Sequence, residues 1–207
     1  SRGLGDVYKR QLRHFPADRR GTDLYGRSRA ERTETNRTFY KKVMYTILEK
    51  RVLAENIYLM RIHAPRVARA AKPGQFIIVR IDEFGERVPL TISDYDAEQG
   101  SVTIVTQAIG ASTRKLCALE QGDALADFVG PLGHPSEFIH EDLDTLRKKR
   151  FLFVAGGVGT APVYPQVKWL HEHGVKADVI IGAKTKSMLI YTEELSLIHI
   201  SEPTRPY

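Results

Sequence analysis

From residue 44 to about residue 126, hydrophobic and polar positions alternate over short stretches. This pattern is typical of strands with one buried face. Turn signals such as Lys72-Pro-Gly74 and Glu98-Gln-Gly100 separate several of the stretches. A single helical pattern at residues 110–123 interrupts them, with Ser112 as its expected N-cap and Gly122 at its end. The expected strands lie at residues 45–52, 57–64, 74–82, 87–96 and 101–110, and residues 124–137 are expected to hold a last strand and a Gly/Pro loop. Closely spaced short strands with one helix predict a small, all-β antiparallel barrel over residues 44–137.

The pattern changes after a charged segment, residues 138–150, which we expect to be a linker. Residues 150–156 and 176–184 are apolar enough for buried strands, and an amphipathic helix is predicted between them at 161–174. Val163, Val167 and Leu170 share one face of that helix, and Gly174 ends it. Residues 188–195 begin a further element. Strand, helix and strand in this order predict a parallel β-α-β unit at residues 151–194, the start of a truncated, doubly wound α/β nucleotide-binding domain.

Charge is distributed unevenly along the 207 residues, whose formal net charge is +6. Residues 1–43 hold twelve Lys/Arg and five Asp/Glu, whereas residues 44–207 hold nineteen and twenty. Because the positive excess lies only at the N-terminal end, we expect no nucleic-acid partner for the folded part. The sequence has no apolar run long enough to cross a bilayer, so we also expect no membrane partner. One cysteine excludes an internal disulfide and favours a reducing, cytoplasmic compartment.

The two ends resemble translated sequencing adapter. One DNA string encodes Asp6–Gln11, and its reverse complement encodes the residues from Leu195 to Ile200. Two ends of a gene have no physical reason to be reverse complements, so we expect residues 1–11 and 195–207 to be adapter-derived. Residues 12–43 are then either leader read in frame or a disordered basic arm. We therefore expect the chain to be a fragment whose sheet lacks its later strands.

Residues 151–165, FLFVAGGVGTAPVYP, change abruptly from a hydrophobic strand to glycines and then to a helix. In an open parallel sheet, ligands bind beyond the carboxyl ends of the strands. Gly156, Gly157 and Gly159 would leave room there for a phosphate, and Pro162 suits the first turn of a helix. The spacing is not that of the common dinucleotide fingerprint G-x-G-x-x-G. Taken alone, such a loop fits a tight turn as well as it fits a dinucleotide site.

Three further stretches accompany this loop: RVPLTIS from Arg87, GASTRKL from Gly110, and GPLG from Gly130. With GGVGTAP, these four stretches resemble, in order, the flavin and nicotinamide motifs of the ferredoxin–NADP reductase superfamily. The resemblance covers most of residues 44–194. It is greatest to the FAD-binding small subunits of sulfide dehydrogenase, also described as NADH-dependent reduced ferredoxin:NADP oxidoreductase. The electron-transfer subunit of dihydroorotate dehydrogenase is a near relative.

The resemblance implies that the chain binds FAD and NAD(P)H and positions them for hydride transfer. The resemblance implies that Arg87 pairs with the FAD pyrophosphate. It also implies that Thr91, Gly157 and Thr160 position the hydride transfer, which needs no catalytic acid or base. The full implied set of cofactor-binding residues is Arg87, Pro89, Leu90, Thr91, Ser93, Gly110, Ser112, Thr113, Gly130, Gly156, Gly157, Gly159, Thr160, Pro162, Gly182 and Ala183. The residues themselves leave open an ordinary surface arginine at Arg87 and simple helix capping at Ser112.

The same resemblance implies partners. Electrons would pass to an iron–sulfur carrier such as ferredoxin, within a complex that includes a larger flavin and iron–sulfur subunit. Full-length members carry a [2Fe–2S] cluster, which needs about four thiolates. With Cys117 as its one cysteine, this chain cannot ligate that cluster, and we expect no metal site in it. Two alternatives remain: an electron-transfer subunit of an NAD-dependent dihydroorotate dehydrogenase, and a non-catalytic FAD-binding module.

Overall fold

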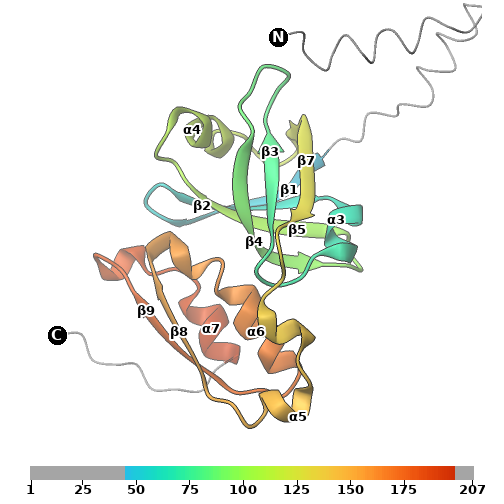
Figure 1. Cartoon of the computed structure of the whole chain (residues 1–207). Coiled ribbons are helices and arrows are strands. Elements are labelled where there is room, and N and C mark those ends of the chain that lie inside the picture. Colours follow the sequence, from blue (N-terminus) through green and yellow to red (C-terminus); the bar gives the residue numbers. More distant parts are fainter. Residues whose placement is uncertain (1–44, 199–207) are drawn as a thin grey trace, which may run out of the picture. The chain divides into compact units, whose positions relative to one another are not determined.

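The structure is a computed structural model that describes residues 45–198 of the chain (Figure 1). The expected leader or basic arm at residues 1–43 lies outside the described residues, and so do residues 199–207 of the adapter-like tail. The described residues form an antiparallel barrel followed by a smaller α/β layer, the order predicted from the sequence.

Seven strands form the barrel, in the order β6-β1-β2-β5-β4-β3-β7, and every neighbouring pair is antiparallel. The six predicted strands are present, and the last of them is divided in two. Their bounds are β1 (Tyr45–Ala54), β2 (Ile57–His63), β3 (Phe76–Arg80), β4 (Val88–Asp96), β5 (Ser101–Gln107), β6 (Ala124–Leu125) and β7 (Asp127–Leu132).

The barrel is nearly closed because its last strand pairs with both edges of the sheet. β6 pairs with β1, and after a single residue, Ala126, the chain continues as β7 and pairs with β3. At this change of partner the Ala126 amide donates to the Arg80 carbonyl at 2.9 Å. Edge strands of this kind would otherwise present unpaired backbone groups. The division of the last strand therefore completes the barrel.

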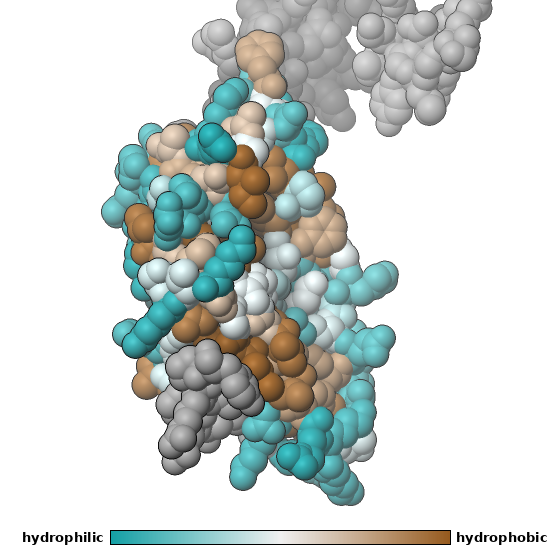
Figure 2. Space-filling model, turned by 90° about the vertical axis from the view of Figure 1, so that its left-hand side faces the viewer, coloured by the Kyte–Doolittle hydropathy of each residue, from teal (hydrophilic) through white to brown (hydrophobic). Residues whose placement is uncertain are grey.

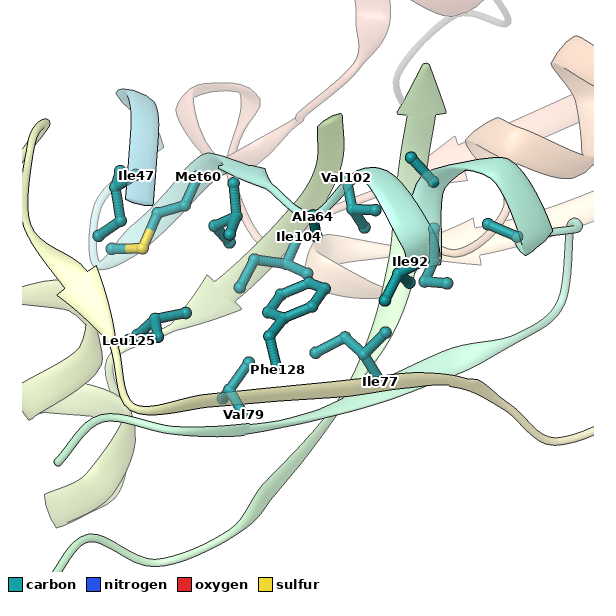
Figure 3. Close-up of a cluster of buried hydrophobic side chains, with 14 of the residues drawn as sticks. Ile47, Met60, Ala64, Ile77, Val79, Ile92, Val102, Ile104, Leu125 and Phe128 are labelled. Atoms are coloured by element: carbon teal, nitrogen blue, oxygen red, sulfur yellow. The ribbon is translucent and has the colours of Figure 1, made fainter. Parts of the chain in front are cut away.

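The barrel core consists of aliphatic side chains from all its long strands, arranged around Phe128 (Figure 3). Phe128 is 2% exposed, and Ile77, Val79, Ile92 and Ile104 around it are fully buried. Burying a side chain of this size contributes about 1.5–3 kcal/mol. The alternation read from the sequence therefore corresponds to the inward face of each strand.

Two short helices accompany the barrel. The sequence analysis did not predict α3 (Pro65–Ala70), which starts with proline in its first turn and buries Val67 and Ala68. The helix α4 (Ala111–Cys117) begins two residues earlier than an N-cap at Ser112 would place it. Its N-cap is Gly110 rather than Ser112, because the Gly110 amide donates to the Thr113 hydroxyl at 3.0 Å. The helix also ends before Gly122, which lies in the following turn with a φ of +95°.

The α/β layer has two parallel strands, β8 (Phe151–Gly156) and β9 (Ala177–Gly182). Between them are a 3₁₀ turn, η2 (Gly157–Thr160), and the predicted helix α6 (Tyr164–Glu172). The proline in the first turn of α6 is Pro165, not Pro162, because η2 delays the start of the helix. After β9 come η3 (Lys186–Met188) and α7 (Thr192–Ile198), which includes the first residues of the expected adapter-like tail.

The strands of the α/β layer are not buried on both faces, as their sequence had suggested. Phe151 and Phe153 face the packed side, whereas Leu152, Val154 and Ile180 are 61%, 69% and 47% exposed. Apolar side chains accordingly gather on the lower part of the surface in Figure 2. Within the described residues, only one face of this two-stranded sheet is covered by helices, which is why the prediction was wrong.

The charged segment expected to be a linker holds two helical turns, η1 (Glu137–His140) and α5 (Leu143–Leu146). Its apolar residues Phe138 and Leu146 are buried against Leu170 and Val175 of the α/β layer. The sequence analysis expected a linker because charged residues surround these two apolar side chains, so it missed their contribution to the core.

Candidate functional site

The outer face of β4 connects the two parts of the molecule. Leu90 and Ile92 point into the barrel core, so the alternate residues Pro89, Thr91 and Ser93 lie on the outside. Pro89 and Thr91 are exposed, whereas Ser93 is completely buried against the α/β layer. At about 3.3 Å per residue, Pro89 and Ser93 are about 13 Å apart along the strand.

An open cleft of about 400 Å³ begins at the Pro89 end of this face. It brings together five of the residues expected to bind cofactor: Arg87, Pro89, Gly110, Ser112 and Thr113. We call it the barrel cleft, and it is lined by Glu86, Arg87, Val88, Pro89, Gln107, Ile109, Gly110, Ala111, Ser112 and Thr113. Its walls combine the Arg87 cation, the Glu86 carboxylate, hydroxyls and the exposed apolar side chain of Ile109, so the cleft offers both polar and apolar contacts to a ligand.

The charged groups at the barrel cleft are fixed by side-chain contacts. Arg87 Nη2 donates to Asp127 Oδ2 at 3.2 Å, and the same oxygen accepts a 2.7 Å bond from Arg80 Nε. The Arg87 side chain is nevertheless 57% exposed. Opposite it, the Ser112 hydroxyl donates to the Glu86 carboxylate. Arg87 is therefore both oriented and accessible to a ligand in the cleft.

Other expected residues of the barrel are not in the cleft lining. Leu90 packs against the barrel core, and Thr91 lies on the exposed face of β4. Gly130 has a packing reason to be glycine, because a Cβ there would lie 2.5 Å from Ile77 Cγ2. Its small size lets β7 approach β3 closely.

The second expected region is the glycine edge, the carboxyl ends of β8 and β9 together with η2. Gly156 of β8 is paired with Gly182 of β9, and exposed Ala183 follows Gly182. A Cβ built on Gly157, Gly159 or Gly182 would meet no atom of the described chain within 4 Å. Gly157 has a φ of +53°, which favours glycine, but packing among the described residues does not explain Gly159 or Gly182. The edge is an open cradle that side chains would fill.

Two expected residues of this loop are enclosed rather than open. Thr160 is only 2% exposed, so its side chain faces the interior. Pro162 is half-buried in the turn before α6, where its carbonyl accepts a 3.0 Å bond from Gln166 Nε2. The open part of the loop is thus its glycines, and its C-terminal part is anchored.

The junction between barrel and α/β layer contains Ser93, which sequence reasoning had assigned to cofactor binding, and Tyr191, which it had not assigned. The Ser93 hydroxyl donates to the Ala161 carbonyl at 3.1 Å and lies 2.7 Å from the Tyr191 hydroxyl. Burial raises the pKa of Tyr191, with Ser93 opposing that shift. No sequence signal pointed to Tyr191, because its partner on β4 is 98 residues away.

Beside this contact, Lys168 of α6 donates to Asp94 of β4 at 2.8 Å. Burial tends to lower the pKa of Lys168, but the hydrogen bond and the charge of Asp94 outweigh it, and the pKa is raised. The pair borders a small cleft of about 60 Å³ that Tyr95, Trp169 and Glu172 also line. A shared hydrophobic cluster extends the junction, with Ile57 and Val105 from the barrel and Ala161 and Val167 from the α/β layer.

Within residues 45–198, no group of three or more His, Cys, Asp and Glu side chains is placed to hold a metal ion. Cys117, the last residue of α4, is buried, and that burial raises the pKa of its thiol. None of the helices in the described range has the length and apolar character needed to span a membrane.

Comparisons with known proteins agree with this architecture. No protein-family profile matches the sequence. A Clostridium beijerinckii protein named "Uncharacterized protein in adh 3'region" is 63% identical over 153 residues, 74% of this chain and 52% of that protein. A Thermotoga maritima protein, a homolog of the dihydroorotate dehydrogenase B (NAD(+)) electron transfer subunit, is 40% identical over 73% of this chain and 51% of its own length. The chain thus spans about half the length of these relatives.

Among solved structures, that of NADH-dependent reduced ferredoxin-NADP oxidoreductase, studied for flavin-based electron bifurcation, has a TM-score of 0.67 and 38% identity. The match covers 75% of this chain and 54% of the other. In sequence and in fold the chain resembles members of the ferredoxin–NADP reductase superfamily. This resemblance, predicted from four short motifs, is confirmed, and so is the predicted barrel with a smaller α/β part.

Proposed function

We propose that this protein binds FAD in the barrel cleft and NAD(P)H at the glycine edge, and transfers electrons between them and a protein partner. One observation carries the proposal: two separate segments, with Arg87 and Pro89 in one and Gly110, Ser112 and Thr113 in the other, line one open cleft. A ferredoxin–NADP reductase barrel with such a cleft supports a flavin cofactor.

The residues of the barrel cleft fit an FAD pyrophosphate. Arg87 offers a planar group of donors suited to phosphate oxygens, and the Ser112 and Thr113 hydroxyls lie on the same cleft. The outer face of β4 leads from this cleft past exposed Thr91 towards the α/β layer. We place the isoalloxazine ring along that face, where backbone groups of Leu90 and Thr91 would contact its edge.

The glycine edge fits the nicotinamide and pyrophosphate of NAD(P)H. Gly156, Gly157, Gly159 and Gly182 leave an open surface at the carboxyl end of two parallel strands, the usual position for a ligand in this type of sheet. Here the chain would hold the nicotinamide against the flavin and exclude water, which requires no acid or base.

When bound, the two cofactors would supply hydride transfer and one-electron chemistry, and the residues of the barrel cleft and the glycine edge would hold them in place. The Thermotoga maritima relative is named as a homolog of an electron transfer subunit, and the similar solved structure is named as an NADH-dependent reduced ferredoxin-NADP oxidoreductase. We favour an assembly like that of the NADH-dependent reduced ferredoxin-NADP oxidoreductase. The complete assembly would then include a larger flavin and iron–sulfur subunit, ferredoxin and a [2Fe–2S] cluster.

The single cysteine of this chain favours a cytoplasmic location.

Two alternatives make different predictions. As a dihydroorotate dehydrogenase electron-transfer subunit, the protein would bind a dehydrogenase with a barrel fold, so the genes beside its own would distinguish the two complexes. As a non-catalytic FAD module, it would bind the flavin but leave it oxidised in NADH and in NADPH.

Anaerobic stopped-flow mixing tests the proposal. FAD-loaded protein, extended by the downstream sequence of its gene, is mixed with NADH or NADPH, and the visible flavin absorption is followed. We expect bleaching, followed by recovery when a one-electron acceptor such as oxidised ferredoxin is added. Retained FAD without bleaching by either nucleotide would contradict the proposed electron transfer.

A further inference from the structure

Three residues connect β4 to the glycine edge through side-chain hydrogen bonds. Ser93 is on the outer face of β4, Ala161 follows η2, and Tyr191 precedes α7. The Ser93 Oγ lies 3.1 Å from the Ala161 carbonyl oxygen and 2.7 Å from the Tyr191 Oη. We call Ser93, Ala161 and Tyr191 the junction clamp.

The hydrogen bonds of the junction clamp have one consistent direction. Ser93 has a single hydroxyl hydrogen, and it is donated to Ala161. The Tyr191 hydroxyl must therefore donate to Ser93. Both side chains are enclosed, at 0% and 6% exposure, so water does not compete for these bonds. A chain of two buried hydrogen bonds, each polarising the other, resists small displacements.

Tyr191 is held in an unusual conformation at this position. Its φ is +60°, a left-handed value that is uncommon for a residue other than glycine. Such a conformation persists when the surroundings over-determine it. Here they do so through the bond to Ser93 and through a stacked contact with Tyr164, whose ring centroid is 4.8 Å away.

We propose that Tyr191 and Ser93 are positioning residues that set the distance between the glycine edge and the outer face of β4. The proposal rests on the proposed function, because it concerns the distance between two bound cofactors. Thr91, where we place the flavin, is two residues from Ser93 on the same face of β4. Ala161 immediately follows the 3₁₀ turn that contains Gly157 and Gly159. The clamp therefore joins the two proposed cofactor surfaces through side-chain hydrogen bonds.

This arrangement matters because hydride transfer requires the reacting atoms to be about 3–3.5 Å apart, and a displacement of about 1 Å lowers the rate by about a hundredfold. The open glycines of the glycine edge, Gly157, Gly159 and Gly182, have no side chains with which to adjust the nicotinamide. Loss of the clamp should thus lower the rate of hydride transfer while leaving the distant barrel cleft, and FAD affinity, unchanged.

Hydrogen–deuterium exchange on this chain tests the clamp without any cofactor. The reporters are the amides of Ala161 and Val163, which donate to Val158 and Thr160 across the loop. Tyr191→Phe keeps the stacked ring and removes only the hydroxyl, and Ser93→Ala removes the central group. Tyr164→Phe is the matched control, since it makes the same change in the other ring of the stack.

In both clamp variants we expect the two reporter amides to exchange about fivefold to tenfold faster, the effect of losing a buried hydrogen bond. The β2–β5 ladder of the barrel should exchange as before, and Tyr164→Phe should resemble the wild type. Unchanged reporters in Tyr191→Phe and Ser93→Ala, or equal acceleration in Tyr164→Phe, would overturn the clamp. If one clamp variant fails to fold, the other decides.

A second measurement distinguishes positioning from a merely structural role. In the FAD-loaded, extended protein, Tyr191→Phe should lower the limiting rate of flavin reduction by roughly tenfold or more with the FAD Kd unchanged. Equal rates in wild type and variant would overturn the positioning role. Failure of the wild type to bind FAD would instead contradict the proposed function, and the exchange result would still decide whether the clamp exists.

Discussion

Arg87 donates to Asp127 across a 3.2 Å Nη2–Oδ2 distance, so the cation at the barrel cleft is held in place by a carboxylate of β7. A guanidinium carries five N–H donors, and this bond uses one of them. The same Asp127 oxygen accepts from Arg80, so the carboxylate is itself fixed. Arg87 is therefore oriented in advance for an anion, and preorganisation of this kind lowers the cost of binding.

Replacement of Arg87 should weaken FAD binding without unfolding the barrel. We expect Arg87→Ala to raise the FAD Kd by about tenfold or more, because charge-assisted hydrogen bonds are worth about 1.5–3 kcal/mol. Fluorescence titration of the apoprotein measures this change. Arg51→Ala is the control, since Arg51 is 51% exposed and also has one acidic partner. A similar loss of affinity in both variants would show that overall charge, not this site, is responsible.

Gly182 offers a test of the glycine edge that separates stability from binding. Its Cβ would meet no described atom within 4 Å, so Gly182→Ala should leave the free energy of unfolding within about 1 kcal/mol of the wild type. The methyl group would nevertheless occupy the proposed nucleotide surface. In the extended protein we expect NAD(P)H affinity to fall and FAD affinity to stay the same. Unchanged NAD(P)H affinity would place the nucleotide elsewhere.

The ion pair between Asp94 and Lys168 should contribute measurably to stability. Both side chains are about 30% exposed, at 29% and 31%. Asp94→Asn removes a charge-assisted bond and leaves a half-buried ammonium without its carboxylate, so we expect a loss of about 1–2 kcal/mol in urea unfolding. Asp144→Asn breaks the exposed pair with Arg147 and should cost less than about 0.5 kcal/mol. Equal losses would mean that the junction is no better packed than the surface.

The raised pKa of Tyr191 predicts a particular dependence of stability on pH. Burial stabilises the neutral phenol, so the folded state keeps its proton at a pH where an unfolded tyrosine, with a pKa of 10.0, has lost it. The contribution of the buried Tyr191 phenol to the free energy of unfolding is therefore fully present below about pH 10 and is lost as the pH rises further. Urea unfolding across this range should show a steep alkaline decline that is weaker in Tyr191→Phe. Parallel curves for the two proteins would contradict the assignment.

The sequence predicted those parts of the fold that repeat a local pattern. Alternating residues such as Ile77 and Val79 indicated the barrel strands because a strand places every second side chain on one face. The six-residue helix α3 is too short to show a helical period, and the exposed face of β8 depends on what covers the sheet.

The sequence predicted only the local parts of the candidate site. Motifs identified Arg87 and Gly110, but only the folded structure shows that the two residues line one cleft. The contact between Ser93 and Tyr191 is a long-range pairing of two ordinary residues, which carries no local signal. Sequence reasoning placed Ser93 at the flavin edge, whereas in the structure its hydroxyl is buried at the junction.

Titration of the purified apoprotein with FAD tests the central claim most directly. We expect one flavin per chain, with a perturbed visible spectrum, and affinity that falls with added salt because a cation holds the pyrophosphate. A chain that folds but takes up no flavin at any FAD concentration, or that binds it equally well as Arg87→Ala, would contradict the account.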